Sequence, residues 1–152
     1  MPRGYHALLF VTPFDPDTKW VDRLTGSYGY GHVALWNGTY TGDVPIVLDS
    51  SVKMGGVFLR PLSEMTGGVP YRSLRLDNAL GRWVYSRAMR CLGANYDYGG
   101  LVSRASRDGL YTCSGLVASC LPRHISDRCR HRWRPISPND LARGLNVPRW
   151  PS

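Results

Sequence analysis

Long apolar segments are missing from this chain of 152 residues. No stretch approaches the roughly 20 apolar residues that a membrane-spanning helix needs. The first apolar run, Ala7–Val11, has five residues and is shorter than the roughly 7–15 apolar residues at the centre of a signal peptide. We therefore expect neither a transmembrane segment nor a signal peptide, and a protein that is cytoplasmic as synthesised unless a phage or a secretion system delivers it elsewhere.

Lysine and glutamate are also scarce, and arginine supplies most of the positive charge. Lys19, Lys53 and Glu64 are the only residues of these two types, while the net charge is +8. Residues 1–76 carry seven Lys or Arg against six Asp or Glu, whereas residues 77–152 carry twelve Arg against five Asp. Such a charge suits an anionic partner. An arginine preference is also typical of a GC-rich genome, so the charge alone does not establish that the protein binds an anionic partner.

Cysteine occurs at only four positions, which could form at most two disulfides. Because no signal peptide is expected, we predict that most of these cysteines are reduced. The chain also contains neither an internal repeat nor a low-complexity linker, and 43% of its residues are apolar. This composition predicts a single domain over residues 1–152 that can bury one core. The four cysteines are Cys91, Cys113, Cys120 and Cys129.

Short apolar runs separated by turn residues dominate the first half of the chain and indicate strands, with a loop at 12–17 and a turn at 37–38. The predicted strands are Ala7–Val11, His32–Trp36, Ile46–Asp49 and Gly56–Arg60. Apolar residues at helical spacing dominate the second half. The predicted helices are 76–91, 113–121 and a short helix that Ser137 and Pro138 open. Strands followed by helices predict an α+β fold, in which a small antiparallel sheet packs against helices.

One cysteine lies where a reactive thiol is favoured. A polar, turn-like approach ends at Thr112, and an apolar helical face then runs from Cys113 to Pro122. The Cys113 sulfur is therefore expected at the first turn of a helix, where unpaired N–H groups and the helix dipole favour a thiolate. The more common role of a cysteine in such a place is that of a small core residue. A nucleophilic role depends on whether the chain supplies a base.

His32 and Asp49 are the residues best placed to assist that thiol. His32 follows Gly31 and begins an apolar strand, and Asp49 ends the next strand, where a fourth apolar residue would be expected. If the two strands are paired neighbours, these side chains lie side by side at one end of the sheet, with the helix of Cys113 across it. A Cys-His-Asp triad would result. A structural histidine and a turn-forming aspartate are the alternative interpretations, and the spacing leaves both open.

Two motifs around the cysteine resemble the nucleophile region of NlpC-type papain-like cysteine hydrolases. Residues 92–100 match a Gly-x-x-Tyr-x-x-Gly-Gly segment, and residues 112–117 match the start of a Cys-Ser-Gly-Leu-Val helix. In that family the catalytic histidine lies downstream on a strand of the type His-Val-Gly-Ile, whereas here the similar strand, His32–Trp36, lies upstream. This order is similar to that of the circularly permuted branch typified by YaeF/YiiX-like proteins, and the resemblance covers about residues 30–142.

The resemblance implies a thiol hydrolase, a cysteine peptidase or amidase that cleaves an amide, peptide or related acyl bond without a cofactor or metal. Cys113 would attack the carbonyl, His32 would activate the thiol, and Asp49 would orient His32. Tyr96 and Ser114 would contact the substrate, although Tyr96 is equally well explained as a packing aromatic. Peptidoglycan peptides are the usual target of the unpermuted relatives and are one candidate substrate, next to cytoplasmic acyl or isopeptide bonds.

Two residues depart from the pattern of the permuted branch. Gly115 stands two residues after the cysteine, where that branch commonly has glutamate, and Asp49 stands where Glu or His is more usual. An aspartate still offers an acceptor to the imidazole N–H. The glycine leaves the substrate class open, because the side chain at that position would line the site.

Arginines crowd into residues 123–134 and support a rival hypothesis. Only Asp127 opposes them, so the segment is either a solvated basic loop or a contact surface for nucleic acid, phospholipid headgroups or an acidic cell-wall polymer. The rival protein would be a catalytically silent papain-like fold that binds such an anionic partner. The five arginines are Arg123, Arg128, Arg130, Arg132 and Arg134.

Ligand types that zinc accepts also occur in this region. Cys120, His124, Cys129 and His131 are spaced Cys-x3-His-x4-Cys-x-His, which is not one of the common zinc patterns. Because Cys120 also falls on the apolar face of its helix, we expect no metal site there.

Overall fold

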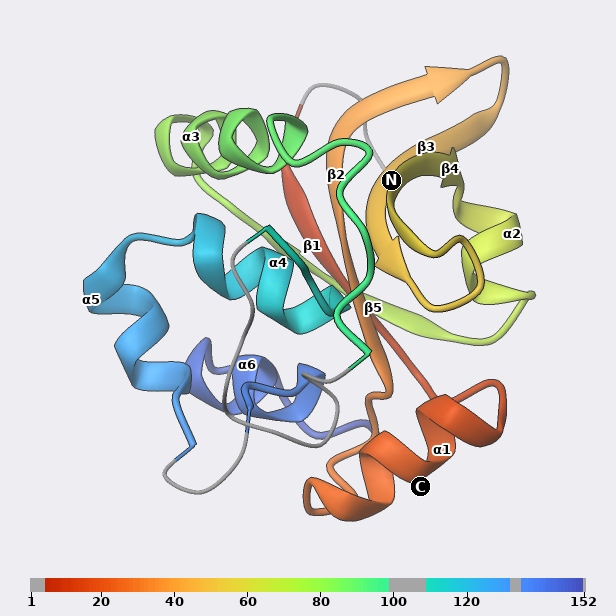
Figure 1. The fold of residues 1–152 in the computed structure, drawn as a ribbon, viewed down its shortest axis with the longest axis vertical. Helices are drawn as coiled ribbons and strands as arrows, with labels where there is room; N and C mark the ends of the chain where they lie inside the picture. Colours follow the sequence, from red (N-terminus) through yellow and green to blue (C-terminus); the bar gives the residue numbers. More distant parts are fainter. Residues whose placement is uncertain (1–4, 99–108, 132–134, 152) are drawn as a thin grey trace.

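Five antiparallel strands form one sheet in the computed structural model of the protein, which describes residues 5–98, 109–131 and 135–151. Helices pack against this sheet, so the predicted α+β class is confirmed (Figure 1). The strands are β1 (Ala7–Val11), β2 (His32–Thr41), β3 (Val44–Ser51), β4 (Gly56–Pro61) and β5 (Tyr71–Arg75). The helices are α1 (Pro16–Leu24), α2 (Leu62–Thr66), α3 (Asn78–Met89), α4 (Cys113–Cys120), α5 (Arg123–Ser126) and α6 (Pro138–Gly144). Within these described residues, every helix is too short or too polar for a membrane span.

The strand order β4-β3-β2-β1-β5 contains the predicted antiparallel meander of the first four strands. Each of these strands pairs with the next along the chain, in registers that include Leu8↔Leu35, Leu35↔Leu48 and Leu48↔Leu59. The sequence did not predict β5, which pairs with β1 through Leu8↔Leu74 and makes β1 an interior strand. This interior position, with both faces covered, explains why β1 is one continuous apolar run.

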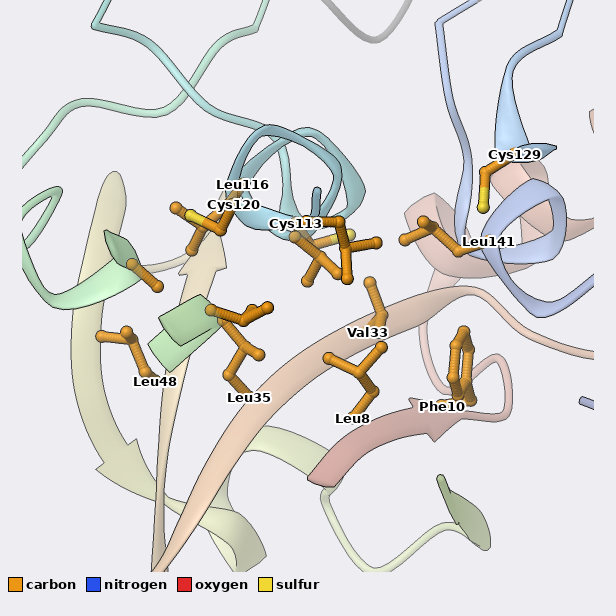
Figure 2. Packing of buried hydrophobic residues seen from close by; sticks show 14 of the residues in the cluster. Leu8, Phe10, Val33, Leu35, Leu48, Cys113, Leu116, Cys120, Cys129 and Leu141 are labelled. Carbon is orange, nitrogen blue, oxygen red and sulfur yellow. The ribbon is translucent and has the colours of Figure 1, made fainter. Parts of the chain in front are cut away.

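Side chains on both faces of the sheet are buried, which gives the described residues two hydrophobic clusters. The larger cluster lies under α3, α4 and α6, and the smaller one lies under α2 on the opposite face (Figure 1). Alternate residues of β1 belong to different clusters, Leu8 and Phe10 to the larger and Leu9 to the smaller. In Figure 2, Leu116 of α4 and Leu141 of α6 approach the strands from the same side. The larger cluster therefore holds α4 against β2 and β3.

Helix α1 begins inside the segment for which the sequence predicts a loop, so the prediction of a loop through residue 17 is wrong. Asp15 is the N-cap, Pro16 is the first helical residue, and the Asp15 carboxylate accepts the Thr18 N–H at 2.8 Å. The Thr18 hydroxyl in turn accepts the Asp15 N–H at 3.0 Å. Aspartate and proline favour turns, but they are also preferred at the N-cap and first position of a helix. Only Thr18 of this helix is buried, so apolar spacing gave little sign of it.

Strand β2 also runs further than predicted. It continues through residues 37–38 to Thr41, and a register irregularity between Trp36 and Tyr40 accommodates the Asn-Gly pair that the sequence assigns to a turn. The chain reverses instead at Gly42, whose φ of +62° suits glycine. β3 is likewise longer than its predicted core of four residues. Asparagine and glycine together therefore marked a bulge and not the hairpin turn.

The predicted helices are present with small shifts of their ends. α3 starts two residues later than predicted, because Asp77 caps it and accepts the Leu80 N–H at 2.9 Å. α3 and α4 end at Met89 and Cys120, within two residues of the predicted ends. α6 starts as predicted, with Ser137 as the N-cap of a capping box.

Candidate active site

Cys113 is the first residue of α4, as the sequence predicts. Thr112 is the N-cap, and its hydroxyl accepts the Gly115 N–H at 2.9 Å. A side chain at residue 115 would place its Cβ 2.7 Å from that hydroxyl oxygen, so the cap requires glycine there unless Thr112 shifts. Cys113 itself is 8% exposed and belongs to the larger hydrophobic cluster (Figure 2). The glycine that departs from the permuted pattern thus has a structural reason.

His32 and Asp49 meet at one end of the sheet, where the sequence predicts them to meet. His32 is the first residue of β2, and Asp49 lies near the end of the adjacent strand β3. A hydrogen bond of 2.6 Å joins His32 Nε2 and Asp49 Oδ1. Both residues are buried, with 7% and 2% of their surface exposed. The antiparallel pairing of two apolar strands therefore holds two titratable groups in hydrogen-bond contact away from water.

The Cys113 sulfur lies against the same imidazole. The sulfur acts on the pKa of His32 both as a charge and as a hydrogen-bond partner, and because Asp49 occupies Nε2, Nδ1 is the ring nitrogen left for the sulfur. Phe14 packs edge-on against the imidazole, with ring centroids 6.1 Å apart and an interplanar angle of 81°. The ring of His32 is thus fixed by a carboxylate, a sulfur and an aromatic ring.

The electrostatics of the site favour a protonated histidine and an ionised aspartate. Burial lowers the pKa of His32, but the Asp49 carboxylate and the Cys113 sulfur raise it by more, to about 10. Burial raises the pKa of Asp49, but the His32 ring and the Arg60 guanidinium lower it by more, to below its ordinary value of 3.8. At neutral pH an imidazolium therefore lies between a carboxylate and a sulfur.

Arg60 completes this buried cluster, and the sequence does not single it out. It lies on β4, is 7% exposed, and donates from Nε at 2.9 Å and from Nη2 at 2.6 Å to Asp49 Oδ2. In the register of β3 and β4, Asp49 pairs with Phe58. Arg60 is two residues further along, so its side chain lies on the same face of the sheet as that of Asp49. Once the register of β3 and β4 is known, the alternation of side chains along β4 identifies Arg60 as a neighbour of Asp49.

The chain that leads to α4 is fastened to the sheet beside this cluster. Ser50, the neighbour of Asp49, donates its hydroxyl to the Tyr111 carbonyl at 2.7 Å. The Tyr96 N–H donates to the Gly55 carbonyl at 2.9 Å, and Tyr96 forms a parallel bridge with Tyr111. These contacts set the position at which α4 begins relative to β3.

A cavity of about 1050 Å³ lies over the cluster and makes it accessible to a ligand. His32, Arg60 and Cys113 all line it. Its other walls come from α1, the turn after β3, α2 and the segment before α6. Much of this wall is apolar, with Phe14, Trp20, Val21, Met65 and Ile136 among the lining residues.

Tyr96 and Ser114, the two predicted substrate contacts, also line this cavity. Burial, together with the negative charges of Cys113 and Asp49, raises the pKa of the Tyr96 hydroxyl, which therefore stays protonated as a hydrogen-bond donor. Ser114 donates its hydroxyl to the Ile136 carbonyl at 2.6 Å and ties α4 to the segment before α6. Contact of either residue with a substrate stays a prediction.

The described residues of the predicted basic segment do not line this cavity. Its described part comprises α5 and the turn after it, where Arg123, Arg128 and Arg130 are exposed and Arg130 pairs with Asp127 at 3.1 Å. A second cavity, of about 520 Å³, has Arg128, Arg130 and His131 in its walls together with Arg143 of α6. Outside the described residues lie Arg132 and Arg134, and with them Gly99 and Gly100 of the family motif.

The residues of the Cys-x3-His-x4-Cys-x-His pattern are not grouped as a metal site. Cys120 and Cys129 are buried in the larger hydrophobic cluster, and burial raises the pKa of both thiols, that of Cys120 to about 11. Among residues 5–98, 109–131 and 135–151, no three His, Cys, Asp or Glu side chains are grouped so that they could hold a metal ion. The two cysteines are therefore core residues.

The chain matches no protein-family model and no curated protein. Its resemblance to the permuted NlpC-type enzymes rests on the sequence motifs and stays a prediction.

Proposed function

We propose that the protein is a papain-like cysteine hydrolase of the permuted NlpC type, which cleaves an amide or a related acyl bond. The main observation in support of this proposal is the hydrogen bond of 2.6 Å between His32 Nε2 and Asp49 Oδ1, with the Cys113 sulfur beside the same ring. The three side chains come from β2, β3 and the start of α4, beside an accessible cavity. A nucleophile, a base and a group that orients the base are the elements of a hydrolytic triad.

In the first step, the Cys113 thiolate attacks the carbonyl carbon of the substrate. A C–S bond forms, and the electron pair of the C=O π bond moves to the oxygen. The first N–H groups of a helix have no partner within the helix, and the N–H of Cys113 would donate to this oxyanion. A donor of this kind contributes about 3 kcal/mol of transition-state stabilisation.

The protonated His32 then supplies the proton that the leaving group needs. Transfer from Nδ1 to the departing nitrogen or oxygen accompanies cleavage of the C–N or C–O bond, and a thioester with Cys113 remains. The neutral ring next takes a proton from water, whose oxygen attacks the thioester carbon. The C–S bond breaks, the product leaves as a carboxylic acid, and the thiolate–imidazolium pair returns. Asp49 stays bonded to Nε2 throughout, so that Nδ1 faces the reacting atoms.

Peptides of the bacterial cell wall are the substrate that the sequence resemblance favours. A phage or a secretion system would then carry the protein to the wall. The substrate class can be identified by measuring hydrolysis of a panel of wall peptides, acyl esters and ubiquitin-like conjugates by the wild type and by Cys113→Ala. We expect turnover of one class by the wild type alone. Turnover of the same substrate by Cys113→Ala, or of no substrate by either protein, would contradict the proposal.

Alkylation tests the triad without knowledge of the substrate. Cys91 is more exposed than Cys113, while Cys120 and Cys129 are buried thiols with raised pKa values. Accessibility alone therefore predicts that iodoacetamide at neutral pH modifies Cys91 first. An activated nucleophile predicts instead that Cys113 is modified first, since the thiolate is the reactive form.

His32→Ala is the decisive variant in this assay. We expect it to abolish the preference for Cys113, because the cation beside the sulfur is lost. Cys91→Ser is the matched control, since it removes the most accessible competitor and should leave the rate at Cys113 unchanged. Faster labelling of Cys91 in the wild type, or a preference for Cys113 that survives in His32→Ala, would count against the triad.

A second candidate function is the binding of an anionic partner by the basic segment. Arg123, Arg128 and Arg130 are exposed close to one another along the chain, and Arg128, Arg130 and Arg143 share the second cavity with one carboxylate, that of Asp140. Positive groups around a hollow attract phosphate or carboxylate groups. This function is compatible with the triad, and it accounts for the charge of the second half of the chain, which the triad does not explain.

Retention on heparin at increasing salt tests this surface. We expect a triple variant of the segment to elute at lower salt than the wild type, because contacts to an anionic polymer are salt-dependent. A control variant with the same net charge should elute between the two. Equal elution of the two variants would exclude a specific role of the segment. The segment variant is Arg123→Gln, Arg128→Gln and Arg130→Gln, and the control is Arg82→Gln, Arg90→Gln and Arg149→Gln, which replace exposed arginines elsewhere.

A further inference from the structure

We infer that Arg60 is a positioning residue of the triad, which keeps the Asp49 carboxylate an anion that faces His32. The inference rests on the proposed function, because it assigns a further residue to the same site. It draws on the hydrogen bonds of Arg60, on the burial of its side chain and on the balance of charge in the cluster.

The two oxygens of Asp49 have separate partners. Oδ1 is bonded to His32 Nε2 at 2.6 Å, while Oδ2 accepts from Arg60 Nε at 2.9 Å and from Arg60 Nη2 at 2.6 Å. Two donors of one planar guanidinium restrict the rotation of the carboxylate. Arg60 thereby fixes which oxygen faces His32 and, through the ring, which nitrogen faces Cys113.

Strand β4 holds Arg60 in place. Arg60 pairs with Val47 of β3 in the strand ladder, and Pro61 follows it as the last residue of β4 and the N-cap of α2. The side chains of Arg60 and Asp49 are 7% and 1% exposed, so water competes little for their ion pair. The guanidinium is therefore a rigid support for the carboxylate.

The charge of Arg60 matters most at the step in which His32 is neutral. In the resting cluster, the Asp49 carboxylate lies between two cations, the His32 imidazolium and the Arg60 guanidinium. After His32 has given its proton to the leaving group, Arg60 is the cation that remains in contact with Asp49. Burial without a cation raises the pKa of a carboxylate, and a protonated Asp49 would no longer hold the Nε2–H of the ring as an anion. Because arginine stays protonated, Arg60 keeps Asp49 an anion that accepts the Nε2–H, so Nδ1 is the nitrogen that takes the proton from water.

Substitutions at residue 60 separate the charge of Arg60 from its hydrogen bonds. Lysine keeps the charge, glutamine keeps a donor without the charge, and methionine keeps only the length. Loss of the charge leaves His32 as the cation of the cluster and weakens the positive field at the Cys113 sulfur, so the acid limb of Cys113 alkylation should move to higher pH. We expect Arg60→Gln and Arg60→Met to react about tenfold more slowly than the wild type near pH 5, and at a similar rate near pH 8. Arg60→Lys should recover most of the rate near pH 5.

Arg72→Gln is the matched control. Arg72 is also an arginine of the sheet with a hydrogen-bond partner, the Tyr30 hydroxyl at 2.9 Å, and its contacts with Tyr30 and Trp150 lie outside the cluster. Circular dichroism establishes that each variant is folded, and if Arg60→Met does not fold, the comparison of the Lys and Gln variants decides. A wild-type pH profile in Arg60→Gln, or an equal displacement in Arg60→Lys, would overturn the inference.

Failure of the role of Arg60 and failure of the proposed function give different results. Alkylation needs no substrate, so a lack of turnover on the substrate panel would refute the hydrolase, while the pH profiles of alkylation would still test the role of Arg60. Turnover together with unchanged profiles would refute the role of Arg60 alone.

Discussion

Replacing Asp49 with asparagine removes the charge that holds His32 protonated. In the wild type, burial lowers the pKa of His32, and Asp49 and Cys113 raise it to about 10. Asparagine is nearly isosteric with aspartate and can still accept a hydrogen bond from Nε2, but it has no charge. We therefore expect the pKa of His32 in Asp49→Asn to fall from about 10 toward its ordinary value of 6.5.

The size of the effect follows from these pKa values. The difference between 6.5 and about 10 corresponds to about 5 kcal/mol of preference for the charged ring. Removing one partner of a buried ion pair typically costs about 3–5 kcal/mol of unfolding free energy. Both His32 and Arg60 lose their counter-ion in the variant, and only His32 can release its proton. We therefore expect Asp49→Asn to lose about 3–5 kcal/mol of stability.

This loss depends on pH with a defined sign. Because folding raises the pKa of His32, its stabilising contribution is complete below pH 6.5 and is lost as the pH rises through about 10. Because folding lowers the pKa of Asp49, its contribution is complete above the ordinary value of 3.8 and is lost as the pH falls through the folded-state value. The difference in unfolding free energy between wild type and Asp49→Asn should therefore be largest between about pH 4 and pH 6.5 and shrink toward pH 10.

Titration of the imidazole NMR signals measures the pKa of His32, and urea unfolding at acidic and alkaline pH measures the stability. Asp127→Asn is the matched control, because it removes a half-exposed carboxylate that pairs with Arg130. Exposed pairs contribute at most about 1 kcal/mol, so this variant should keep the titration of His32 and nearly all of the stability. A His32 that titrates near 6.5 in the wild type, or near 10 in Asp49→Asn, would refute the reasoning.

Three further substitutions test the support of the site. Gly56→Ala places a Cβ 2.0 Å from the Ala94 carbonyl oxygen and should lower the melting temperature through a loss of about 1–3 kcal/mol; an unchanged melting temperature would mean that the neighbouring segment moves aside. Ser137→Ala removes the N-cap hydroxyl of α6 and should cost about 1 kcal/mol in urea unfolding, whereas Ser137→Thr should keep the cap, because its hydroxyl can still accept the Asp140 N–H and donate to the Asp140 carboxylate. Cys120→Ser buries a hydroxyl in the larger cluster and should cost about 1–3 kcal/mol without slowing the alkylation of Cys113. Slower alkylation would connect Cys120 to the site.

Local patterns explain what could be predicted from the sequence. The apolar run Ala7–Val11 has the same bounds as β1, and the change from polar to apolar residues at Thr112 puts Cys113 at the first position of α4. The contact of His32 with Asp49 follows from two consecutive strands, since consecutive strands usually pair. Each of these predictions depends on residues that are neighbours in the chain or in adjoining strands.

Contacts between distant or ambiguous segments could not be predicted in this way. Three of the five residues of β5 are polar and they do not alternate with apolar ones, and its partner β1 is far away along the chain. Asp15 and Pro16 suit a turn as well as the start of a helix. Arg60 is an ordinary strand-end residue until the register of β3 and β4 shows that Asp49 lies beside it on the same face. For β5 and Arg60 the missing information was a strand pairing, which residue types alone do not specify.

The residues of the site differ in their separation along the chain. His32 and Asp49 are 17 residues apart, and Asp49 and Arg60 are 11 residues apart, so one strand meander contains all three. Cys113 comes from a helix much later in the sequence. Short loops close at a lower entropic cost than long ones, and local contacts form faster. We therefore expect the three charged partners to assemble early in folding and the thiol to join them last, so that an incompletely folded chain carries an inert cysteine.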